Sequence, residues 1–233
     1  MSEPAERHPE LRAALRDLAK HFPDEYFRRV DAARGYPVEF VDALTQAGWL
    51  AVMIPEEYGG AGLGLAEASV VMEEVNRCGG NAGACHGQMY NMGTLLRHGS
   101  VEQKRRYLPG IASGKLRLQS MGVTEPSTGT DTTQLKTTAL RRGDRYVVNG
   151  QKVWISRVQH SDLMILLART TPLAEVKRPT EGLSLFYSDF DLTRIRVHEI
   201  EKMGRKVVDS NELFFEGFEI PVEDRIGEEG KGV

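Results

Sequence analysis

The chain has 233 residues, of which 40% are hydrophobic and 27% charged, and its formal net charge is −3. This composition supports one large domain or two modest ones with real cores, and the charge disfavours a sequence-independent nucleic-acid binder, which needs a concentrated basic surface. No run approaches the roughly 18 apolar residues that span a bilayer, and the start, MSEPAERHPE, has neither an apolar stretch nor a cleavage-like site, so we expect a soluble, cytoplasmic protein without a membrane span.

The first half of the sequence has the three-to-four-residue apolar spacing of amphipathic helices. This spacing runs first from Leu11 to Phe22. Pro37 then opens a second segment of the same period, which Gly48 closes. Proline in the first turn and glycine after the last are typical of a helix, so two helices are predicted here.

Two further helices are expected before the period changes. One should run from about Ala66 to Arg77. Ser100 and Gln103 form a capping box for the next, which the proline–glycine pair at 109–110 should interrupt. The pattern therefore predicts four or five helices before residue 114.

Three other features of this half have ordinary interpretations. Residues 54–64 are too rich in glycine for a helix and are predicted to form an ordered loop. The basic residues 104–106 are expected to form a solvated helix face rather than a phosphate site. Cys78 and Cys85 lack a CxxC motif or paired histidines, which favours two thiols in a reducing compartment and gives no metal ligands.

From about Leu116 the sequence has the pattern of short strands. Segments 137–142 and 145–148 are expected to form a hairpin around Gly143 and Asp144, and 145–148 a second hairpin with 152–156 around Asn149 and Gly150. Further strands are expected at 163–168, 183–187, 195–200 and 212–218.

The predicted fold class is therefore α+β. An all-helical amino-terminal domain, residues 1–115, should be followed by an antiparallel β-barrel or sandwich, residues 116–233.

Residues 121–131, MGVTEPSTGTD, leave a strand for a stretch rich in hydroxyls and turn formers. By themselves they are either an ordinary loop or a backbone cradle for something polar. Trp154 is similarly ambiguous, because an indole in a strand most often fills a core.

Five segments together resemble a known family. They are IPEEYGG, EQKRRYLP, VTEPSTGTD, RYVVNGQKVWIS and EGFEIPVEDRIGEEGKG. In this order they resemble the acyl-CoA dehydrogenases, flavin enzymes that introduce a trans double bond between the α and β carbons of acyl-CoA thioesters. The resemblance runs from about Leu11 to Val233 and implies the same helical-then-β organisation.

The resemblance implies FAD as cofactor and two segments that contact it. The implied FAD-binding residues are Met121, Gly122, Val123, Thr124, Gly129, Thr130, Trp154, Ile155 and Ser156. The indole of Trp154 would lie against the flavin ring, and the hydroxyl of Ser156 would reach N5, the atom that receives the hydride. Thr130, where the family commonly has Ser, would contact a phosphate or the pantetheine of CoA. Thr130 and Met92 are the implied substrate-binding residues.

No catalytic residue is assigned in this sequence. His86 and Glu125 are expected to be hydrogen-bonding structure. Arg157, where the family often has Asn, is expected to face either the phosphates of the ligand or solvent. In the family the base is a Glu on a carboxy-terminal helical bundle, which this chain, ending at Val233, does not contain.

The expected function is that of an FAD-dependent acyl-CoA dehydrogenase of fatty-acid metabolism, in which α-proton abstraction accompanies β-hydride transfer to N5. This chain is expected to be a fragment that is inactive alone. Expected partners are the acyl-CoA substrate, an electron-transfer flavoprotein as electron acceptor, and further copies of the full-length protein. The alternatives are a flavin oxidase or monooxygenase of the same fold and a non-catalytic interaction module.

Overall fold

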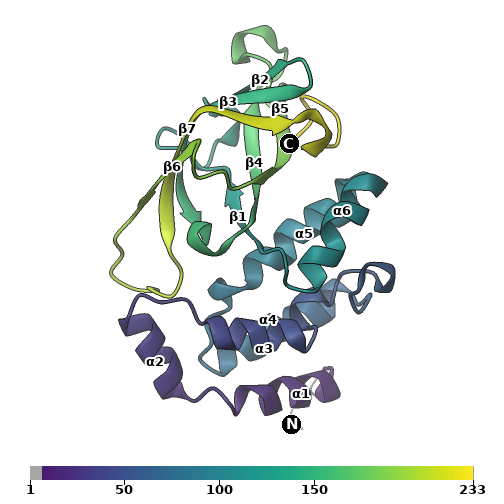
Figure 1. The fold of residues 1–233 in the computed structure, drawn as a ribbon, viewed down its shortest axis with the longest axis vertical. Coiled ribbons are helices and arrows are strands. Elements are labelled where there is room, and N and C mark those ends of the chain that lie inside the picture. The colour runs from purple at the N-terminus through teal and green to yellow at the C-terminus, as the bar shows by residue number, and fades with distance from the viewer. Residues whose placement is uncertain (1–6, 233) are drawn as a thin grey trace, which may run out of the picture.

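The computed structural model describes residues 7–232, and these form a helical half followed by a β half (Figure 1). The α-helices are α1 (Pro9–Ala19), α2 (Asp24–Ala32), α3 (Val38–Gln46), α4 (Leu65–Arg77), α5 (His86–His98) and α6 (Val101–Ala112). The strands are β1 (Leu118–Gly122), β2 (Thr138–Arg142), β3 (Arg145–Ser156), β4 (Leu163–Arg169), β5 (Leu183–Asp189), β6 (Ile195–Glu199), β7 (Ser210–Pro221) and β8 (Arg225–Ile226). The predicted α+β class is confirmed.

The helical half differs from the sequence prediction at three points, since neither α2 nor α5 is among the helices predicted by position and α6 differs in its extent. The short helix α2 was not predicted, because an apolar period is hard to recognise over nine residues, although Tyr26, Phe27 and Val30 form an apolar face that packs on the helical core. The expected interruption of α6 is wrong, since the helix continues through Pro109 to Ala112. Proline removes one backbone hydrogen bond, but Leu108 and Ile111 on either side of it are fully buried, and their packing holds the helix.

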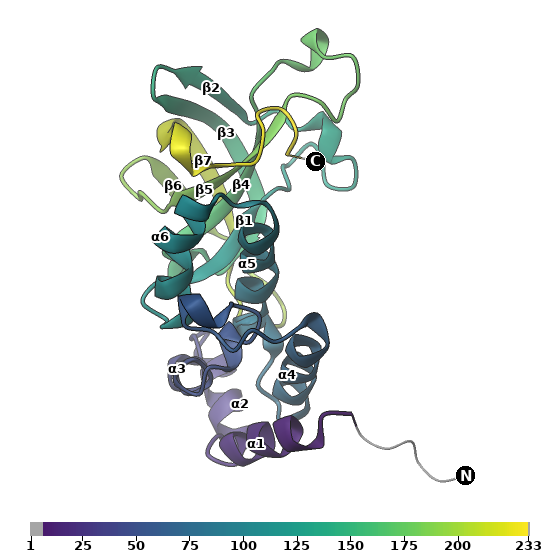
Figure 2. The same cartoon turned by 90° about the vertical axis from the view of Figure 1, so that its right-hand side faces the viewer.

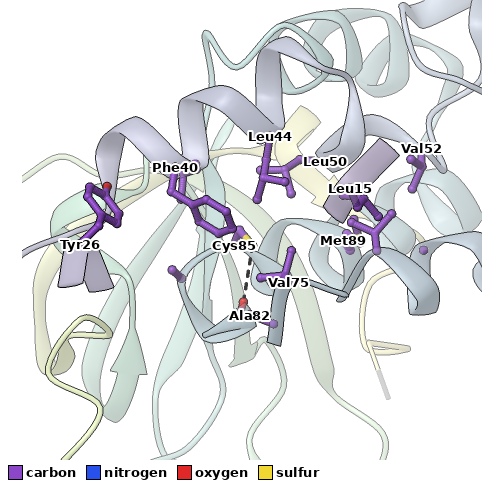
Figure 3. Close-up of a cluster of buried hydrophobic side chains, with 14 residues drawn as sticks. Leu15, Tyr26, Phe40, Leu44, Leu50, Val52, Val75, Ala82, Cys85 and Met89 are labelled. Carbon is purple, nitrogen blue, oxygen red and sulfur yellow. Dashed lines mark hydrogen bonds between the residues drawn. The ribbon is translucent and has the colours of Figure 1, made fainter. Parts of the chain in front are cut away.

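An apolar cluster joins the helices α1 to α4 (Figure 3). Phe40 lies at its centre, with edge-to-face contacts to Phe22 and Phe27 at ring separations of 5.1 Å each. Cys85 is part of the same cluster, and burial raises the pKa of its thiol to about 12. Both cysteines are free, as expected, and Cys85 acts as a small apolar side chain.

The β half is one eight-stranded sheet with the order β6-β7-β3-β2-β4-β5-β8, while β1 pairs with β4 outside this path. Most neighbouring strands are antiparallel, which confirms the antiparallel character predicted from the short strands. The exceptions are at β4, to which β1 runs parallel along its length and β2 pairs in parallel through Thr138 and Arg169. Strand β1 is the one that leads into residues 121–131.

The hairpin predicted around Asn149 and Gly150 is wrong, because β3 is continuous and pairs along its length with β7. A Cβ on Gly150 would lie 2.6 Å from the Cα of Thr137, so glycine is needed for close approach of the neighbouring strand. The Oδ1 of Asn149 accepts the N–H of Gly217 at 2.8 Å. The other predicted hairpin, around Gly143, is confirmed.

The two halves share a core, with α5 and α6 lying directly against the sheet (Figures 1 and 2). The members of this shared cluster are Ala51, Ile54, Met92, Leu95, Tyr107, Leu108, Ile111, Ala112, Leu118, Leu163, Ile165, Tyr187 and Ile226. The approach of α5 to β1 requires Gly87, because a Cβ there would lie 2.6 Å from the carbonyl oxygen of Gln119. The Tyr107 hydroxyl donates to Asp224 at 2.7 Å. These contacts place α5 beside the strand that precedes the candidate site.

Candidate functional site

The structure brings residues 121–131 next to the end of β3. The ammonium Nζ of Lys152 donates to the carbonyl of Val123 at 2.9 Å, and the N–H of Val153 donates to the carbonyl of Thr124 at 2.9 Å. The two segments that the sequence pattern singled out are therefore neighbours. We call residues 123–137 the site segment.

Trp154 is exposed at this junction. Its relative exposure is 59%, and it has a left-handed backbone with φ of 63° at a break in the register between Lys152 and Ile155. The core interpretation of this indole is therefore wrong. Ile155 is buried in the core of the sheet, so only its backbone can face a ligand, while Ser156 is half-buried. Left-handed backbone in a bulky residue is strained, and such strain concentrates at functional sites.

The site segment folds as a tight turn with outward hydroxyls. The backbones of Glu125 and Thr128 exchange hydrogen bonds of 2.9 and 3.2 Å. Beyond this turn, Gly129 and Thr130 are exposed, and within residues 7–232 their amides have no acceptor. Asp131 accepts the N–H of Thr133 at 3.1 Å and so stabilises the loop, as expected.

Three hydroxyls near this turn also lack a partner. Those of Thr124, Thr130 and Ser156 make no hydrogen bond to any residue from 7 to 232. Met121, at the end of β1, is 36% exposed. The surface therefore offers apolar area and free hydrogen-bonding groups side by side, the mixture that a ligand with a flat ring and polar edges requires.

Two expected contact residues lie inside the protein instead. Gly122 faces the core, because a Cβ on it would lie 3.1 Å from the sulfur of Met164. Met92 has no exposed surface and belongs to the cluster that joins the two halves. The structure therefore does not bring the Met92 side chain to the exposed face formed by Met121 and Trp154.

Arg157 contradicts both orientations expected from the sequence. Its side chain faces neither solvent nor a phosphate site: it is buried, forms an ion pair with Asp209, and lies 4.8 Å from the centre of the Tyr36 ring. Burial lowers the pKa of this guanidinium. Its role is to join β3 to the β6–β7 connection and to the helical half. Sequence alone could not show this, because both partners are distant along the chain.

His86 and Glu125 both serve as hydrogen-bonding structure, as expected. The Nδ1 of His86 lies 3.1 Å from the carbonyl oxygen of Ala82, and burial lowers the pKa of the imidazole. The carboxylate of Glu125 accepts the N–H groups of Lys136 at 2.7 Å and Thr137 at 3.0 Å. Both groups are already engaged.

Lys152 is a buried residue of the site for which the sequence pattern predicted no role. It is fully buried, and its ammonium lies 2.9 Å from the Glu125 carboxylate. Burial lowers the pKa of Lys152 to about 8, although Glu125 opposes the change. Burial also acts to raise the pKa of Glu125, but Lys152 and the hydrogen bonds hold it below its usual value. The sequence does contain an indication that Lys152 is buried. The two-residue period of β3 puts Lys152 on the same inward face as Tyr146 and Val148.

The structure gives no support to a metal site or a membrane span. Within residues 7–232, no group of three or more His, Cys, Asp or Glu side chains could hold a metal ion. Over the same residues, no helix has both the length and the apolar character to cross a bilayer.

Comparison with protein families decides the relationship of the chain. The family model described as "Acyl-CoA dehydrogenase, N-terminal domain" matches residues 5–115, and the model described as "Acyl-CoA dehydrogenase, middle domain" matches residues 120–218. The chain belongs to the acyl-CoA dehydrogenase family. The resemblance stated from five sequence segments is thereby confirmed.

Individual acyl-CoA dehydrogenases agree with this membership. The chain is 32% identical to cyclohex-1-ene-1-carbonyl-CoA dehydrogenase of Syntrophus aciditrophicus over 234 residues, covering 100% of this chain and 56% of that protein. An acyl-CoA dehydrogenase structure from Geobacillus kaustophilus has a TM-score of 0.89 at 30% identity, with 99% of this chain and 60% of the other covered. A chain from work on the electron transferring flavoprotein of Acidaminococcus fermentans has a TM-score of 0.87 at 28% identity, with 100% and 61% covered. The chain thus spans less than two thirds of each of these proteins.

Acyl-CoA dehydrogenases are flavoproteins that bind FAD. The exposed side chains and free backbone groups described above have the chemical character that binding FAD requires. An exposed indole can support a flat ring, and the unpartnered hydroxyls of Thr124 and Ser156 can donate to its polar edge. The free amides of Gly129 and Thr130 suit phosphate oxygens. The buried carboxylate of the same segment, Glu125, is paired with Lys152 and so does not repel an anion at this turn.

Proposed function

We propose that this chain carries the FAD-contacting part of an acyl-CoA dehydrogenase that oxidises the α,β bond of an acyl-CoA thioester. One observation carries the proposal: the strained, exposed Trp154 lies beside the site segment, where the hydroxyls of Thr124 and Thr130 and the amides of Gly129 and Thr130 have no partner among residues 7–232. Family membership then names the ligand that such a surface would hold.

Each residue has a proposed role set by its geometry. The indole of Trp154 packs against the ring system, while Met121 adds apolar area at the same junction. Thr124 and Ser156 orient the polar edge. Thr130 lies where a phosphate or pantetheine would pass. The remaining proposed contacts come from backbone, and they are those of Gly122, Val123, Gly129 and Ile155. Met92 would act only through packing in the cluster that joins the two halves.

Bound FAD would supply the two-electron acceptor for the hydrogen leaving the β carbon. The chain's own groups bind and orient it and cover one side of it from water. Glu125 cannot take the α proton, because its carboxylate is occupied by Lys152 and two backbone N–H groups. We therefore assign no proton acceptor among residues 7–232.

The proposal includes the partners and the domain division. The substrate class is an acyl-CoA, as the name of the Syntrophus relative suggests, and an electron-transfer flavoprotein is the proposed electron acceptor, in line with the Acidaminococcus comparison. We propose residues 1–115 and 116–233 as the two domains and a homo-oligomer for the full-length protein.

Flavin binding tests the proposal directly. The purified 233-residue chain is titrated with FAD while the flavin fluorescence and visible spectrum are recorded, and Trp154→Ala is titrated alongside. We expect saturable binding that weakens at least about fivefold in the variant, since stacking of a large aromatic is worth ~1 kcal/mol or more. Absence of binding by the wild-type chain would favour the interaction-module alternative and refute the proposal.

A second experiment tests the reaction. The protein as its gene encodes it is loaded with FAD and mixed anaerobically with acyl-CoAs of several lengths, and bleaching of the flavin is followed. Bleaching that reverses only slowly in oxygen supports a dehydrogenase. Rapid reoxidation by oxygen would indicate an oxidase or monooxygenase of the same fold, and no bleaching with any acyl-CoA would exclude the proposed reaction.

A further inference from the structure

The site segment rests on three buried charged side chains, Glu125, Lys152 and Arg169, which we call the support cluster. Their exposed fractions are 4%, 0% and 4%. These side chains are too deeply buried to contact a ligand directly. Their hydrogen bonds are directed at the backbone of the segment instead.

Glu125 and Lys152 together close the site segment. Glu125 lies near the start of the site segment. Its carboxylate accepts hydrogen bonds from the backbone N–H groups of Lys136 and Thr137, at the end of the segment. The Lys152 ammonium bridges this carboxylate, at 2.9 Å, and the carbonyl of Val123, also at 2.9 Å. The first and last residues of the segment are thus tied to one strand through one ion pair.

Arg169, the last residue of β4, holds the middle of the segment. Its Nη2 donates to the carbonyl of Thr133 at 2.6 Å, and its Nε donates to that of Leu135 at 3.3 Å. Its Nη1 reaches the carbonyl of Glu181 at 3.2 Å in the β4–β5 connection. Within residues 7–232 no carboxylate forms a direct ion pair with Arg169: its N–H groups donate to carbonyl oxygens, and the Glu125 carboxylate acts on its charge only from a distance.

The support cluster therefore holds two cations and one carboxylate. Burying charge is costly, and a surplus positive charge is useful where the functional state adds an anion nearby. The turn with the free amides of Gly129 and Thr130 lies in the segment that this cluster holds. An anionic group bound at that turn would be attracted by the surplus charge without touching it.

We propose that Lys152 is a positioning residue, which through Glu125 fixes the site segment in the conformation that holds the anionic part of the ligand. The identity of that ligand as FAD rests on the proposed function, but the positioning itself does not. Lys152 precedes Trp154 by two residues in β3, so one strand carries both the indole and the cation that anchors the facing loop.

Hydrogen exchange in the ligand-free 233-residue chain tests the positioning. Lys152→Met keeps the length of the side chain but removes its charge, and we expect amides of residues 123–137 to exchange at least about tenfold faster while the helices α1 to α4 exchange as in the wild type. Lys152→Arg, which keeps the charge and donors, should stay within about threefold of the wild type. The matched control is Glu74→Gln, which breaks a buried ion pair in the helical half and should accelerate exchange at residues 123–137 no more than at the other amides of the β half.

A double variant tests whether Lys152 acts through Glu125. Glu125→Gln combined with Lys152→Met should accelerate exchange no more than the stronger single variant, because both remove one linkage. Additive effects, unchanged exchange in Lys152→Met, or acceleration equal to that in Glu74→Gln would each overturn the proposal.

FAD affinity completes the test. In Lys152→Met it should weaken at least about tenfold, with recovery in Lys152→Arg, and an unchanged affinity despite faster exchange would show that the segment's position does not serve the ligand. Failure of the wild-type chain to bind FAD would refute the proposed function instead, and the exchange measurements would still decide whether Lys152 positions the segment.

Discussion

Trp154 combines three properties that rarely occur together: a large apolar side chain, high exposure and a left-handed backbone. Each is unfavourable in a ligand-free protein, because the indole gains little from burial and its φ of 63° is strained. An exposed residue that lowers the stability of the fold, as Trp154 does, is expected at a position where it contacts a ligand.

Replacing this residue should separate stability from binding. Trp154→Gly should raise the free energy of unfolding by about 1 kcal/mol, because glycine adopts this backbone without strain. The same variant should lose FAD affinity. Chemical denaturation and FAD titration measure the two effects, with Met203→Ala, at a residue 99% exposed, as the control that should change neither. A loss of stability in Trp154→Gly would show that the indole supports the fold.

At the scale of elements, α1 and α4 are joined by a buried carboxylate. Glu74 on α4 accepts from Arg12 at 2.7 Å and from Arg16 at 2.9 and 2.7 Å. Hydrogen bonds from Arg16, and then from Arg12, lower the pKa of Glu74 against the opposing effect of burial. Since the folded pKa is the lower one, this ion pair stabilises the fold above pH ~4.5 and is lost as pH falls through the folded value.

Glu74→Gln should therefore be destabilising by about 2–4 kcal/mol near pH 7, because it removes the buried charge that accepts hydrogen bonds from both Arg12 and Arg16. The difference from the wild type should narrow as pH falls below ~4.5, where the wild-type carboxylate also becomes protonated. Urea denaturation of both proteins at several pH values provides the measurement. A constant difference across pH would mean that the charge of Glu74 is not the cause.

Glycine is required at residue 150 because the backbone of Thr137, in the neighbouring segment, lies too close to allow a Cβ. Gly150→Ala should cost about 2–3 kcal/mol, because its φ is +148° and the new Cβ would meet the Thr137 backbone. Gly143→Ala is the matched control: its φ is also positive, at +62°, but its surroundings are open, so only ~1 kcal/mol is expected. Equal losses of unfolding free energy would show that backbone strain alone matters at residue 150.

At the scale of the whole molecule, the shared cluster makes the two halves depend on each other. Leu108 on α6 is fully buried among residues of both halves, including Leu118 and Tyr187. A core that crosses between two units couples their unfolding, so we expect a single cooperative transition.

Leu108→Ala tests this coupling. It should destabilise the chain by about 2–5 kcal/mol, as large-to-small core substitutions do, and shift the unfolding of both halves equally. Far-ultraviolet circular dichroism reports mainly the helices, and fluorescence in a Trp49→Phe background reports Trp154 in the β half. Two separate transitions would contradict a shared core.

Much of the fold followed from local pattern. The strand regions, the Gly143 hairpin and four of the helices were predictable, because periodicity depends on residues close in sequence. The turn predicted at Asn149 is wrong because the conformation there depends on residues distant in sequence. Thr137 packs against Gly150, and β7 pairs with β3 along its length. The family resemblance predicted two segments that the structure places side by side, whereas the buried charges beneath them could not be predicted.

The sequence by itself determined the helical and β halves, the family and the two segments that meet at the candidate site. Only the tertiary structure decided that Trp154 is exposed, that Arg157 is buried on Tyr36, and that Lys152 lies beneath the site segment. The reason is physical: propensity and period are properties of neighbours along the chain, while burial and the partner of a charge are set by residues far apart in sequence and become defined only when the core forms.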